Sequence, residues 1–359
     1  MNRRHALRRS GIAAVLAAGS APAVHAQPVV RWRLASSFPR SLDTIHGAAE
    51  VFAQQVRAMS GGRFQISVHA PGELMPAFGV VDGVQQGQVE ACHTAPYYFV
   101  DKDEAFAIGA AIPFGLTSRQ MSAWMFQGNG LQLMREFYAG YGFTSFPGGN
   151  TGAQMGGWFR REIRSAADVK GLRMRIAGFA ARIVEPLGCV PYNLPGGDIH
   201  AALQQGRIDA AEWVGPYDDW KLGLQKVAPY YYYPGWWEGG LQVDFFVNLR
   251  AYEALSAEYK AILAAASGYT HVDMQARYDA RNPVALKQLV AAGARLRPFP
   301  GDMMTAAFRV ARAIYADLSA RNPAWRKIYA DYARFRADQN VWFRFTEATF
   351  DRFMQSQRL

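Results

Sequence analysis

The chain has 359 residues, of which 50% are hydrophobic and 19% charged, and its formal net charge is +10. This length fits two α/β lobes better than one, and interleaved basic and acidic residues argue against a nucleic-acid-binding surface. Two cysteines, Cys92 and Cys189, are too few for a disulfide framework, so we expect two buried free thiols.

The first 26 residues predict a signal for export to the periplasm. Basic residues up to Arg9 precede an apolar stretch rich in glycine and alanine, and Val24-His25-Ala26 is typical of a cleavage site. Paired arginines leave general secretory and twin-arginine export both open. Cleavage near Ala26 removes four arginines and no acidic residue, which lowers the formal net charge from +10 to +6. No later segment is apolar for a membrane-spanning length, so we expect a soluble mature protein.

Strands and helices alternate over the first part of the mature chain. Alternating apolar and polar residues predict strands over 29–35, 64–69 and 91–94. Helical patterns over 44–59 and 80–86 separate these strands. Because such alternation is typical of parallel sheets, we expect an α/β fold with a largely parallel sheet.

The middle of the chain predicts two crossings between lobes. A segment at 143–150 leads into a strand at 154–159, and a strand at 241–248 leads back, before a helix over 251–280 that we expect to end at Pro283. Lobes joined by neighbouring strands predict a hinge. We therefore expect four parts: an export signal (1–26), lobe I (27–149 plus 241–282), lobe II (150–240 plus 283–324) and a C-terminal helical extension (325–359).

The stretch from 171 to 215 carries the most specific motif. It contains an R-M-R strand, then L-G-x-x-P, then A-L-Q-x-G-x-x-D-x-x-E. Together with TGAQMGGWF and GWWEGG, it resembles the solute receptors of tripartite ATP-independent periplasmic (TRAP) transporters, most closely the branch that binds 2-oxo or 2-hydroxy monocarboxylic acids. Such receptors usually have D-G-x before the glutamate, whereas here Asp209 is followed by two alanines that leave Glu212 in register. The resemblance implies a two-lobed periplasmic solute-binding fold with a hinge and a long C-terminal helix, and delivery of the solute to a membrane permease.

Arg175 is the candidate anchor for a carboxylate. It lies in the alternating strand 172–176, which runs into Gly178, and the carboxyl ends of such strands are where open α/β sheets hold ligands. A guanidinium matches a carboxylate in two parallel charge-assisted hydrogen bonds. A strand arginine is more often a structural ion-pair partner, but the resemblance favours Arg175 as the residue that binds the ligand carboxylate. Arg173 should face the opposite side and serves as a control.

Two glutamates predict a bound cation. Glu212 lies near a strand end, and Glu238 precedes Gly239-Gly240, where bare backbone allows a ligand or ion to approach closely. Both carboxylates would repel an anionic substrate unless a cation lies between them. An all-oxygen shell suits a hard ion, whereas the scattered histidines do not suit zinc.

The resemblance implies a metal site made by Gln154, Glu212, Glu238 and a main-chain oxygen at Trp213, with sodium or calcium bridging to the substrate. Calcium binds carboxylates more strongly than sodium, but the choice between the two ions stays open. Trp213 is expected to form a wall of the pocket. Tyr97 and Tyr98 either donate phenol hydrogen bonds to the ligand or pack within their loop.

A hydrolase is the alternative from another class, with Glu212 and Glu238 as acid and base. Against it, the chain has no G-x-S-x-G, H-E-x-x-H or C-x-x-C motif. We therefore expect a receptor that performs no chemistry.

The C-terminal segment carries an aromatic face at near-helical spacing. Such a face either packs on its own chain or contacts a partner. In the 2-oxo-acid branch an exchanged C-terminal helix forms a dimer, so the resemblance implies a homodimer. The residues concerned are Trp325, Ile328, Tyr329, Tyr332, Phe335, Trp342, Phe343, Phe350 and Phe353.

Overall fold

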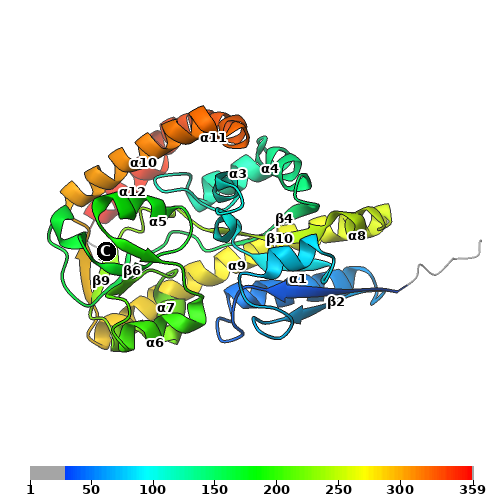
Figure 1. The fold of residues 1–359 in the computed structure, drawn as a ribbon, viewed down its shortest axis with the longest axis horizontal. Helices are drawn as coiled ribbons and strands as arrows, with labels where there is room; N and C mark the ends of the chain where they lie inside the picture. Colours follow the sequence, from blue (N-terminus) through cyan, green and yellow to red (C-terminus); the bar gives the residue numbers. More distant parts are fainter. Residues whose placement is uncertain (1–28, 358–359) are drawn as a thin grey trace, which may run out of the picture.

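The structure is a computed structural model that describes residues 29–357, so the expected export signal lies outside the described residues. Its strands form two sheets, around which the helices are arranged (Figure 1). The first sheet has the order β2-β1-β3-β10-β4. Its strands are β1 (Val30–Ser36), β2 (Phe64–His69), β3 (Ala91–Thr94), β4 (Phe143–Asn150) and β10 (Gln242–Asn248).

This first sheet is mixed. Strand β1 pairs in parallel with β2 and β3, as the strand–helix alternation predicts. Strand β10, however, runs antiparallel to both β3 and β4. Strand β4 therefore runs in the same direction as β1, β2 and β3, and the prediction of a largely parallel sheet fails only at β10, which enters between β3 and β4 from the opposite direction.

The second sheet has the order β11-β9-β5-β8-β6-β7. Strand β6 lies between β7 and β8 and is parallel to both, with Arg175 opposite Tyr192 and Ala211. Its strands are β5 (Gly157–Phe159), β6 (Arg173–Arg175), β7 (Val190–Tyr192), β8 (Ala210–Ala211), β9 (Tyr230–Tyr233) and β11 (Arg295–Pro298).

Strand β5 is shorter than the sequence predicts. We expect a strand from residue 154, but pairing begins only at Gly157. Gly157 has a φ of +89°, and a Cβ there would lie 2.6 Å from the carbonyl oxygen of Ala211, so the backbone can turn this close to β8 only at a glycine. Gln154 therefore stays in a loop.

Helices cover both sheets. Helix α1 is amphipathic and packs Phe52 against Phe245 of β10, with ring centroids 4.0 Å apart. Helix α3 begins at a capping box formed by Thr117 and Gln120. The helices are α1 (Ile45–Met59), α2 (Val80–Gln85), α3 (Ser118–Phe126), α4 (Gly130–Ala139), α5 (Ala180–Val184), α6 (Ile199–Gln204), α7 (Pro216–Leu222), α8 (Leu249–Glu253), α9 (Ala257–Ala291), α10 (Gly301–Arg321), α11 (Pro323–Phe345) and α12 (Glu347–Ser356).

Helix α9 continues through Pro283, so the prediction that it ends there is wrong. Proline removes one helical hydrogen bond, but contacts just before it and the buried residues Ala285 and Leu289 after it hold the helix. The Tyr278 hydroxyl donates to Asp218 at 2.7 Å, and Asn282 Oδ1 accepts from the backbone N–H of Tyr217 at 3.0 Å. Helix α9 contacts α1 and β4 as well as α7, so it spans elements of both sheets, and residues 282 and 283 lie inside it.

The C-terminal segment divides into α11 and α12 instead of forming one helix. The first half of its aromatic face packs on its own chain: Trp325 and Tyr332 are buried, and the Tyr332 hydroxyl accepts from the backbone N–H of Leu116 at 2.7 Å. The second half is exposed, with Trp342, Phe345, Phe350 and Phe353 between 59% and 73% accessible.

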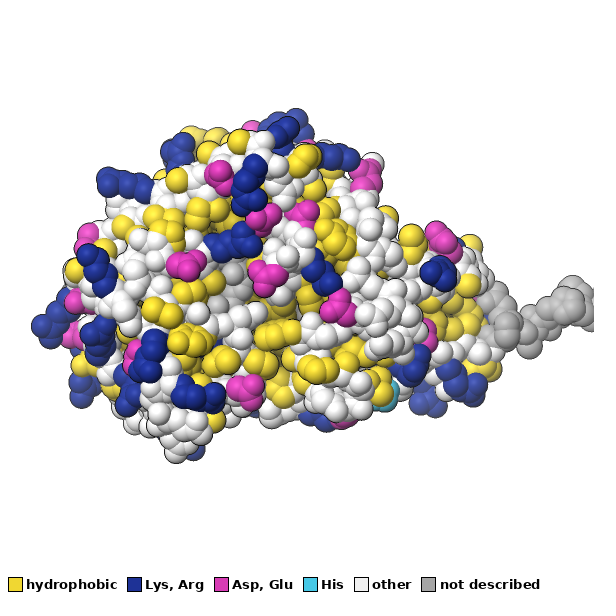
Figure 2. All heavy atoms as spheres, viewed as in Figure 1, with side chains coloured by type: hydrophobic (Ala, Val, Ile, Leu, Met, Phe, Trp, Pro, Cys, Tyr) yellow, Lys and Arg dark blue, Asp and Glu magenta, His cyan; other side chains and the backbone are white. Residues whose placement is uncertain are grey.

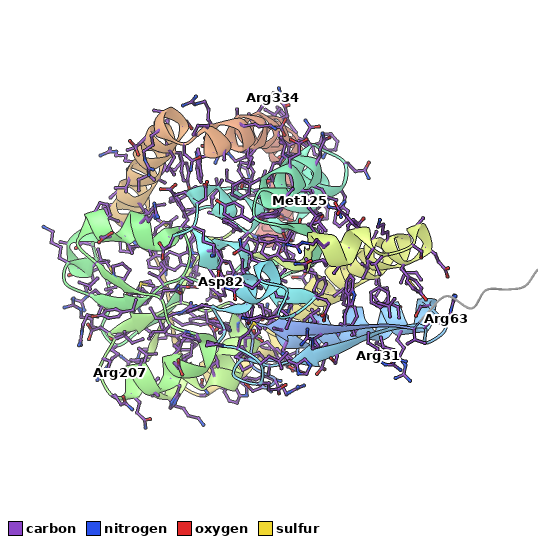
Figure 3. All side chains as sticks on the ribbon, turned by 45° about the vertical axis from the view of Figure 1, so that its right-hand side comes forward. Arg31, Arg63, Asp82, Met125, Arg207 and Arg334 are labelled. Carbon is purple, nitrogen blue, oxygen red and sulfur yellow. The ribbon has the colours of Figure 1, made fainter. Side chains whose placement is uncertain are left out.

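Charged side chains lie on the surface without a basic tract. Figure 2 shows lysines and arginines interspersed with aspartates and glutamates over one face. In Figure 3, Arg63, Arg207 and Arg334 extend outward at the periphery, while Met125 lies within the molecule. Cys92 and Cys189 are buried free thiols, which confirms that prediction. Between residues 29 and 357, no helix is both long and apolar enough to cross a membrane.

Candidate functional site

Arg175 is the last residue of β6 and is 1% exposed. Its Nε atom donates to the Leu194 carbonyl at 3.0 Å, and Nη1 donates to the Glu212 carbonyl at 2.7 Å and to Glu212 Oε1 at 2.5 Å. The Arg175 Cζ atom lies 4.8 Å from the ring centroid of Trp213, within cation–π distance. A buried guanidinium is costly unless it is paired in this way, so the surrounding groups fix its orientation.

Glu212 is held beside Arg175 by the pairing of β6 and β8. Its backbone N–H donates to the Arg175 carbonyl at 3.0 Å, and its Oε1 atom also accepts from the Ala177 N–H at 3.0 Å. Burial raises the pKa of Glu212, while the Arg175 charge and the Ala177 N–H oppose the rise. The sequence prediction that the two residues share a pocket corresponds here to a direct ion pair.

Four buried polar atoms of this region have no hydrogen-bond partner within residues 29–357. They are Arg175 Nη2, Glu212 Oε2, Glu238 Oε2 and Gln154 Oε1. Because buried polar groups are nearly always paired, unpaired atoms of this kind mark a place where a ligand completes the bonding. One is a cationic donor and three are oxygen acceptors, a set that suits a carboxylate next to a cation.

Gln154 presents its oxygen because its amide nitrogen is already used. Nε2 donates to the Thr151 hydroxyl at 3.0 Å, and the same hydroxyl accepts from the Leu241 N–H at 3.0 Å. The Gln154 carbonyl accepts from the Gly235 N–H at 3.0 Å, which holds the loop of Gln154 beside the segment leading to Glu238. The amide oxygen is therefore the free end of this side chain.

The charge of Glu212 affects the ionisation of the Glu238 side chain. Burial, together with the Glu212 charge, raises the pKa of Glu238 well above its usual value. Interactions with the Tyr97 and Gln154 side chains and the Arg175 charge oppose this rise. Two carboxylates that disfavour each other's ionisation in a buried site favour a bound cation.

The glycines after Glu238 have a different role from the predicted one. A Cβ at Gly239 would lie 2.5 Å from the Leu116 carbonyl oxygen, and the Gly239 carbonyl accepts from the Ser118 N–H at 3.0 Å. The expectation that bare backbone here admits a ligand or ion is wrong, because the 116–118 segment occupies that side.

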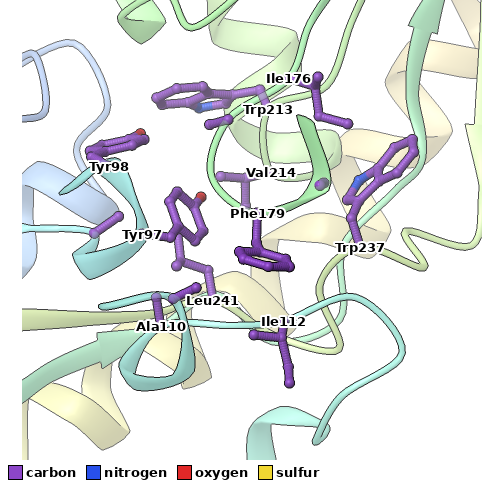
Figure 4. Close-up of a cluster of buried hydrophobic side chains, with 14 of the residues drawn as sticks. Tyr97, Tyr98, Ala110, Ile112, Ile176, Phe179, Trp213, Val214, Trp237 and Leu241 are labelled. Atoms are coloured by element: carbon purple, nitrogen blue, oxygen red, sulfur yellow. The ribbon is translucent and has the colours of Figure 1, made fainter. Parts of the chain in front are cut away.

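Tyr97 and Tyr98 lie on the turn η1 (Pro96–Phe99), directly after β3 of the first sheet. Burial raises the pKa of both phenols; the Glu238 charge adds to the rise for Tyr97, and the Arg175 charge opposes it for Tyr98. Figure 4 shows both tyrosines on one side and Trp213 and Phe179, carried by loops of the second sheet, on the other. The region therefore joins groups from both sheets.

Gly178 allows this approach. It has a φ of +63°, and a Cβ there would lie 2.5 Å from the Tyr97 ring, so a larger residue would push the loop after β6 away from η1. Arg173 lies outside this cluster: it pairs with Asp209 at 2.8 Å, with the two side chains 41% and 28% exposed. Residues two apart on a strand share a face, so the expectation that alternation places Arg173 opposite Arg175 is wrong, and their different partners distinguish the two arginines.

The donor set fits a hard cation. Within residues 29–357 no three His, Cys, Asp or Glu side chains form a metal site by themselves. An ion here would take the Glu212 and Glu238 carboxylates, the Gln154 amide oxygen and oxygens of the main chain and ligand. Oxygen-only ligands of this kind suit sodium or calcium and not zinc.

Comparison with known proteins identifies the family. Residues 35–322 match the family described as bacterial extracellular solute-binding protein, family 7. The chain belongs to this family. It is 44% identical over 331 residues to a monocarboxylate 2-oxoacid-binding periplasmic protein of Nostoc sp., a match that covers 92% of this chain and 91% of the relative.

Solved solute-binding proteins of TRAP transporters have the same two-lobed fold. One from Bordetella bronchiseptica, a dimer with calcium and picolinate in one site, is 44% identical with a TM-score of 0.90, covering 92% of this chain and 98% of that one. Another from Pseudoalteromonas atlantica, with bound sodium and pyruvate, is 36% identical with a TM-score of 0.88, covering 92% and 99%. The predicted family and fold are confirmed, and the hydrolase alternative finds no support in these solute-binding relatives.

Some contacts of the site were not predicted from the sequence. The Leu194 carbonyl and the Ala177 N–H both orient the Arg175–Glu212 pair, and both are main-chain groups. Residue type carries no signal for a main-chain contact.

Proposed function

We propose that this solute-binding protein captures a small 2-oxo or 2-hydroxy monocarboxylate together with a sodium or calcium ion and delivers it to the membrane permease of a TRAP transporter. The observation that carries the proposal is the cluster of four unpaired buried atoms on Arg175, Glu212, Glu238 and Gln154. The relatives that bind picolinate with calcium and pyruvate with sodium support this ligand class.

Each residue has a separate role in this proposal. Arg175 offers its free Nη2 to the ligand carboxylate, and the Tyr97 and Tyr98 hydroxyls donate to its oxygens. The side-chain oxygens of Gln154, Glu212 and Glu238 and the main-chain oxygen of Trp213 bind the ion, which also takes a ligand oxygen. The protein binds and releases its ligand without chemistry.

Closure of two lobes over the ligand follows from the same residues. We assign 27–149 plus 241–282 to lobe I, 150–240 plus 283–324 to lobe II and 325–359 to the C-terminal extension. Export with cleavage near Ala26 would place the mature protein in the periplasm. Ligand contacts from both lobes favour the closed state.

Two polar clusters support closure. Glu104, between β3 and α3, accepts from Arg182 of α5 at 2.9 Å and from Arg321 of α10 at 2.8 Å. Partial burial favours its neutral form, but hydrogen bonds from Arg321, Asn322 and Arg182 hold the pKa of Glu104 at about 2.

The second cluster centres on Asp43, which lies between β1 and α1. It accepts from Tyr217 of α7 and from Arg281 of α9, both at 3.2 Å, and pairs with Lys221 of α7. Arg182 and Arg321 join Glu104 to lobe II, and Tyr217 and Lys221 join Asp43 to lobe II, whereas Arg281 lies in lobe I with Asp43. The contacts to lobe II would break when the lobes part.

Calorimetry with a panel of solutes tests the function. Small 2-oxo acids such as pyruvate are expected to bind with micromolar or tighter dissociation constants, about −8 kcal/mol or better, in buffer containing calcium or sodium. Neutral sugars serve as the control and should release no binding heat. Absence of binding by every 2-oxo and 2-hydroxy acid, or turnover of aryl glycosides or esters, would contradict the proposal.

The exposed aromatic residues of α11 and α12 support a homodimer through the C-terminal helix. Four large side chains more than half exposed on neighbouring helices form the kind of surface that marks an interface. Removing residues 346–359 is expected to change the mass measured by light scattering at micromolar concentration from two chains to one. Leu74→Asp, which alters an exposed apolar residue on another element, should leave the mass unchanged. A monomeric wild-type protein would refute the dimer.

A further inference from the structure

Asp218 is a fully buried carboxylate in α7 that the proposed ligand and ion do not touch. Its exposed fraction is 0%, and its Oδ2 atom accepts from the Tyr278 hydroxyl of α9 at 2.7 Å. Taking a carboxylate out of water is costly unless hydrogen bonds replace the lost hydration. One hydroxyl satisfies only one of its two oxygens, so the second oxygen needs a donor.

Trp213 carries a buried donor that is also without a partner. Among the residues described, Asp218 Oδ1 and Trp213 Nε1 are both buried, and neither atom has a partner at hydrogen-bond distance. Burial raises the pKa of Asp218 to about 6, and hydrogen bonding by the Tyr278 and Trp213 side chains opposes the rise. An indole nitrogen can only donate, and a carboxylate oxygen accepts, so the two atoms complement each other.

The Trp213 ring in turn supports Arg175. The guanidinium carbon lies 4.8 Å from the ring centroid. A Cβ at Gly196 would lie 2.5 Å from Cη2 of the same ring, so the Gly196 backbone packs closely against the ring edge. The orientation of the indole therefore limits the plane in which the guanidinium can lie.

We propose that Asp218 is a positioning residue for ligand binding, which accepts the Trp213 indole N–H and so fixes the ring on which the Arg175 guanidinium rests. The argument rests on the proposed function, in which the free Nη2 of Arg175 grips the ligand carboxylate. Charge-assisted hydrogen bonds of a planar fork are directional, and a small error in placement lowers their strength. Asp218 acts on the ligand only through Trp213 and Arg175.

Asp219, the next residue of α7, provides a matched control. It is buried as well, but its Oδ2 atom accepts from Trp158 Nε1 at 2.9 Å and from the Tyr231 hydroxyl at 2.6 Å, while Oδ1 accepts from the Val214 N–H at 3.5 Å. None of these donors is the Trp213 ring that lies against Arg175. Loss of either carboxylate should destabilise the fold. Only loss of Asp218 should also change the position of the ligand anchor.

A double-mutant cycle tests whether Asp218 affects ligand binding through Trp213. With pyruvate and calcium as the probe, Asp218→Asn is expected to weaken binding about tenfold in the wild-type background and less than about twofold in the Trp213→Phe background. Asp219→Asn should retain affinity within about threefold while lowering the melting temperature. Equal losses from Asp218→Asn in both backgrounds, or equal losses from the two aspartate substitutions, would overturn the proposal.

An NMR signal of the ligand-free protein separates this inference from the proposed function. In protein labelled with ¹⁵N at tryptophan, the Trp213 indole resonance, assigned with Trp213→Phe, should shift and exchange faster in Asp218→Asn. An unchanged signal would overturn the pairing, whereas a changed signal in a protein that binds no 2-oxo acid would reject only the proposed function. If Asp218→Asn does not fold, Tyr278→Phe removes just the hydroxyl that orients the carboxylate. This variant is expected to shift the same signal and weaken binding about threefold, and an unmoved signal would count against the proposal.

Discussion

Replacing Arg175 with alanine is expected to weaken binding of a 2-oxo acid by about a hundredfold to a thousandfold. The substitution removes the only cationic side chain bonded to Glu212 and leaves that carboxylate buried without its ion-pair partner, as well as removing the free Nη2 donor. Loss of one member of a buried pair is costly because the other charge stays desolvated. Arg175→Lys keeps the charge without the planar fork and should recover only part of the affinity.

Arg173→Ala is the control for this experiment. Arg173 lies two residues away on the same strand, and its partner Asp209 is partly exposed, so the pair contributes little. We expect the ligand affinity of Arg173→Ala to stay within about threefold of the wild-type value. Calorimetry on both variants, with melting curves to establish that each is folded, gives the comparison. Equal affinities for Arg175→Ala and the wild type would exclude a role for Arg175 in binding the ligand carboxylate.

Removing the cation is the second change with a large expected effect. Without it, the Glu212 and Glu238 carboxylates, Arg175 and a monocarboxylate carry two net negative charges in a buried volume. Transfer into choline chloride buffer with a chelator should therefore weaken binding about a hundredfold, and addition of calcium or sodium should restore it. Native mass spectrometry of the purified protein would identify the ion directly.

Glu238→Gln tests the same site by substitution. The amide keeps the shape and one oxygen but loses the charge that attracts the ion, so both ion and ligand should bind less tightly, by about tenfold. Glu185→Gln changes an exposed acid near the second sheet and should have no effect. Unchanged ligand affinity in chelator-treated protein, with no ion detected by mass spectrometry, would show that the unpaired oxygens serve another purpose.

Local patterns predicted the elements that depend on nearby residues. Strands β1, β2 and β3 follow from local alternation of apolar and polar residues. The two-residue period of a strand puts residues 173 and 175 on the same face, so it does not explain why the two arginines have different partners. Elements that depend on distant contacts were predicted less well. Helix α9 passes Pro283 because α7 is bonded to Tyr278 and Asn282 just before the proline, and no local signal reports that packing.

The candidate site, too, was predicted only where nearby residues determine it. The motif indicated which residues carry oxygen and guanidinium groups, but not which of their atoms are left free. That depends on partners such as Thr151, which takes the amide nitrogen of Gln154 and leaves its oxygen unpaired. The sequence could not indicate the role of Asp218 either, since an acid in the first turn of a helix is favoured for its own sake.

The near-complete enclosure of Arg175 has a kinetic consequence. Because Arg175 is 1% exposed and Tyr97 packs against Gly178, we expect a bound solute to leave only when the lobes part, so its residence time should depend on how often the Asp43 and Glu104 clusters come apart. Affinity and escape rate can therefore vary separately. A permease that competes for these surface charges would hasten unloading at the membrane without weakening capture elsewhere.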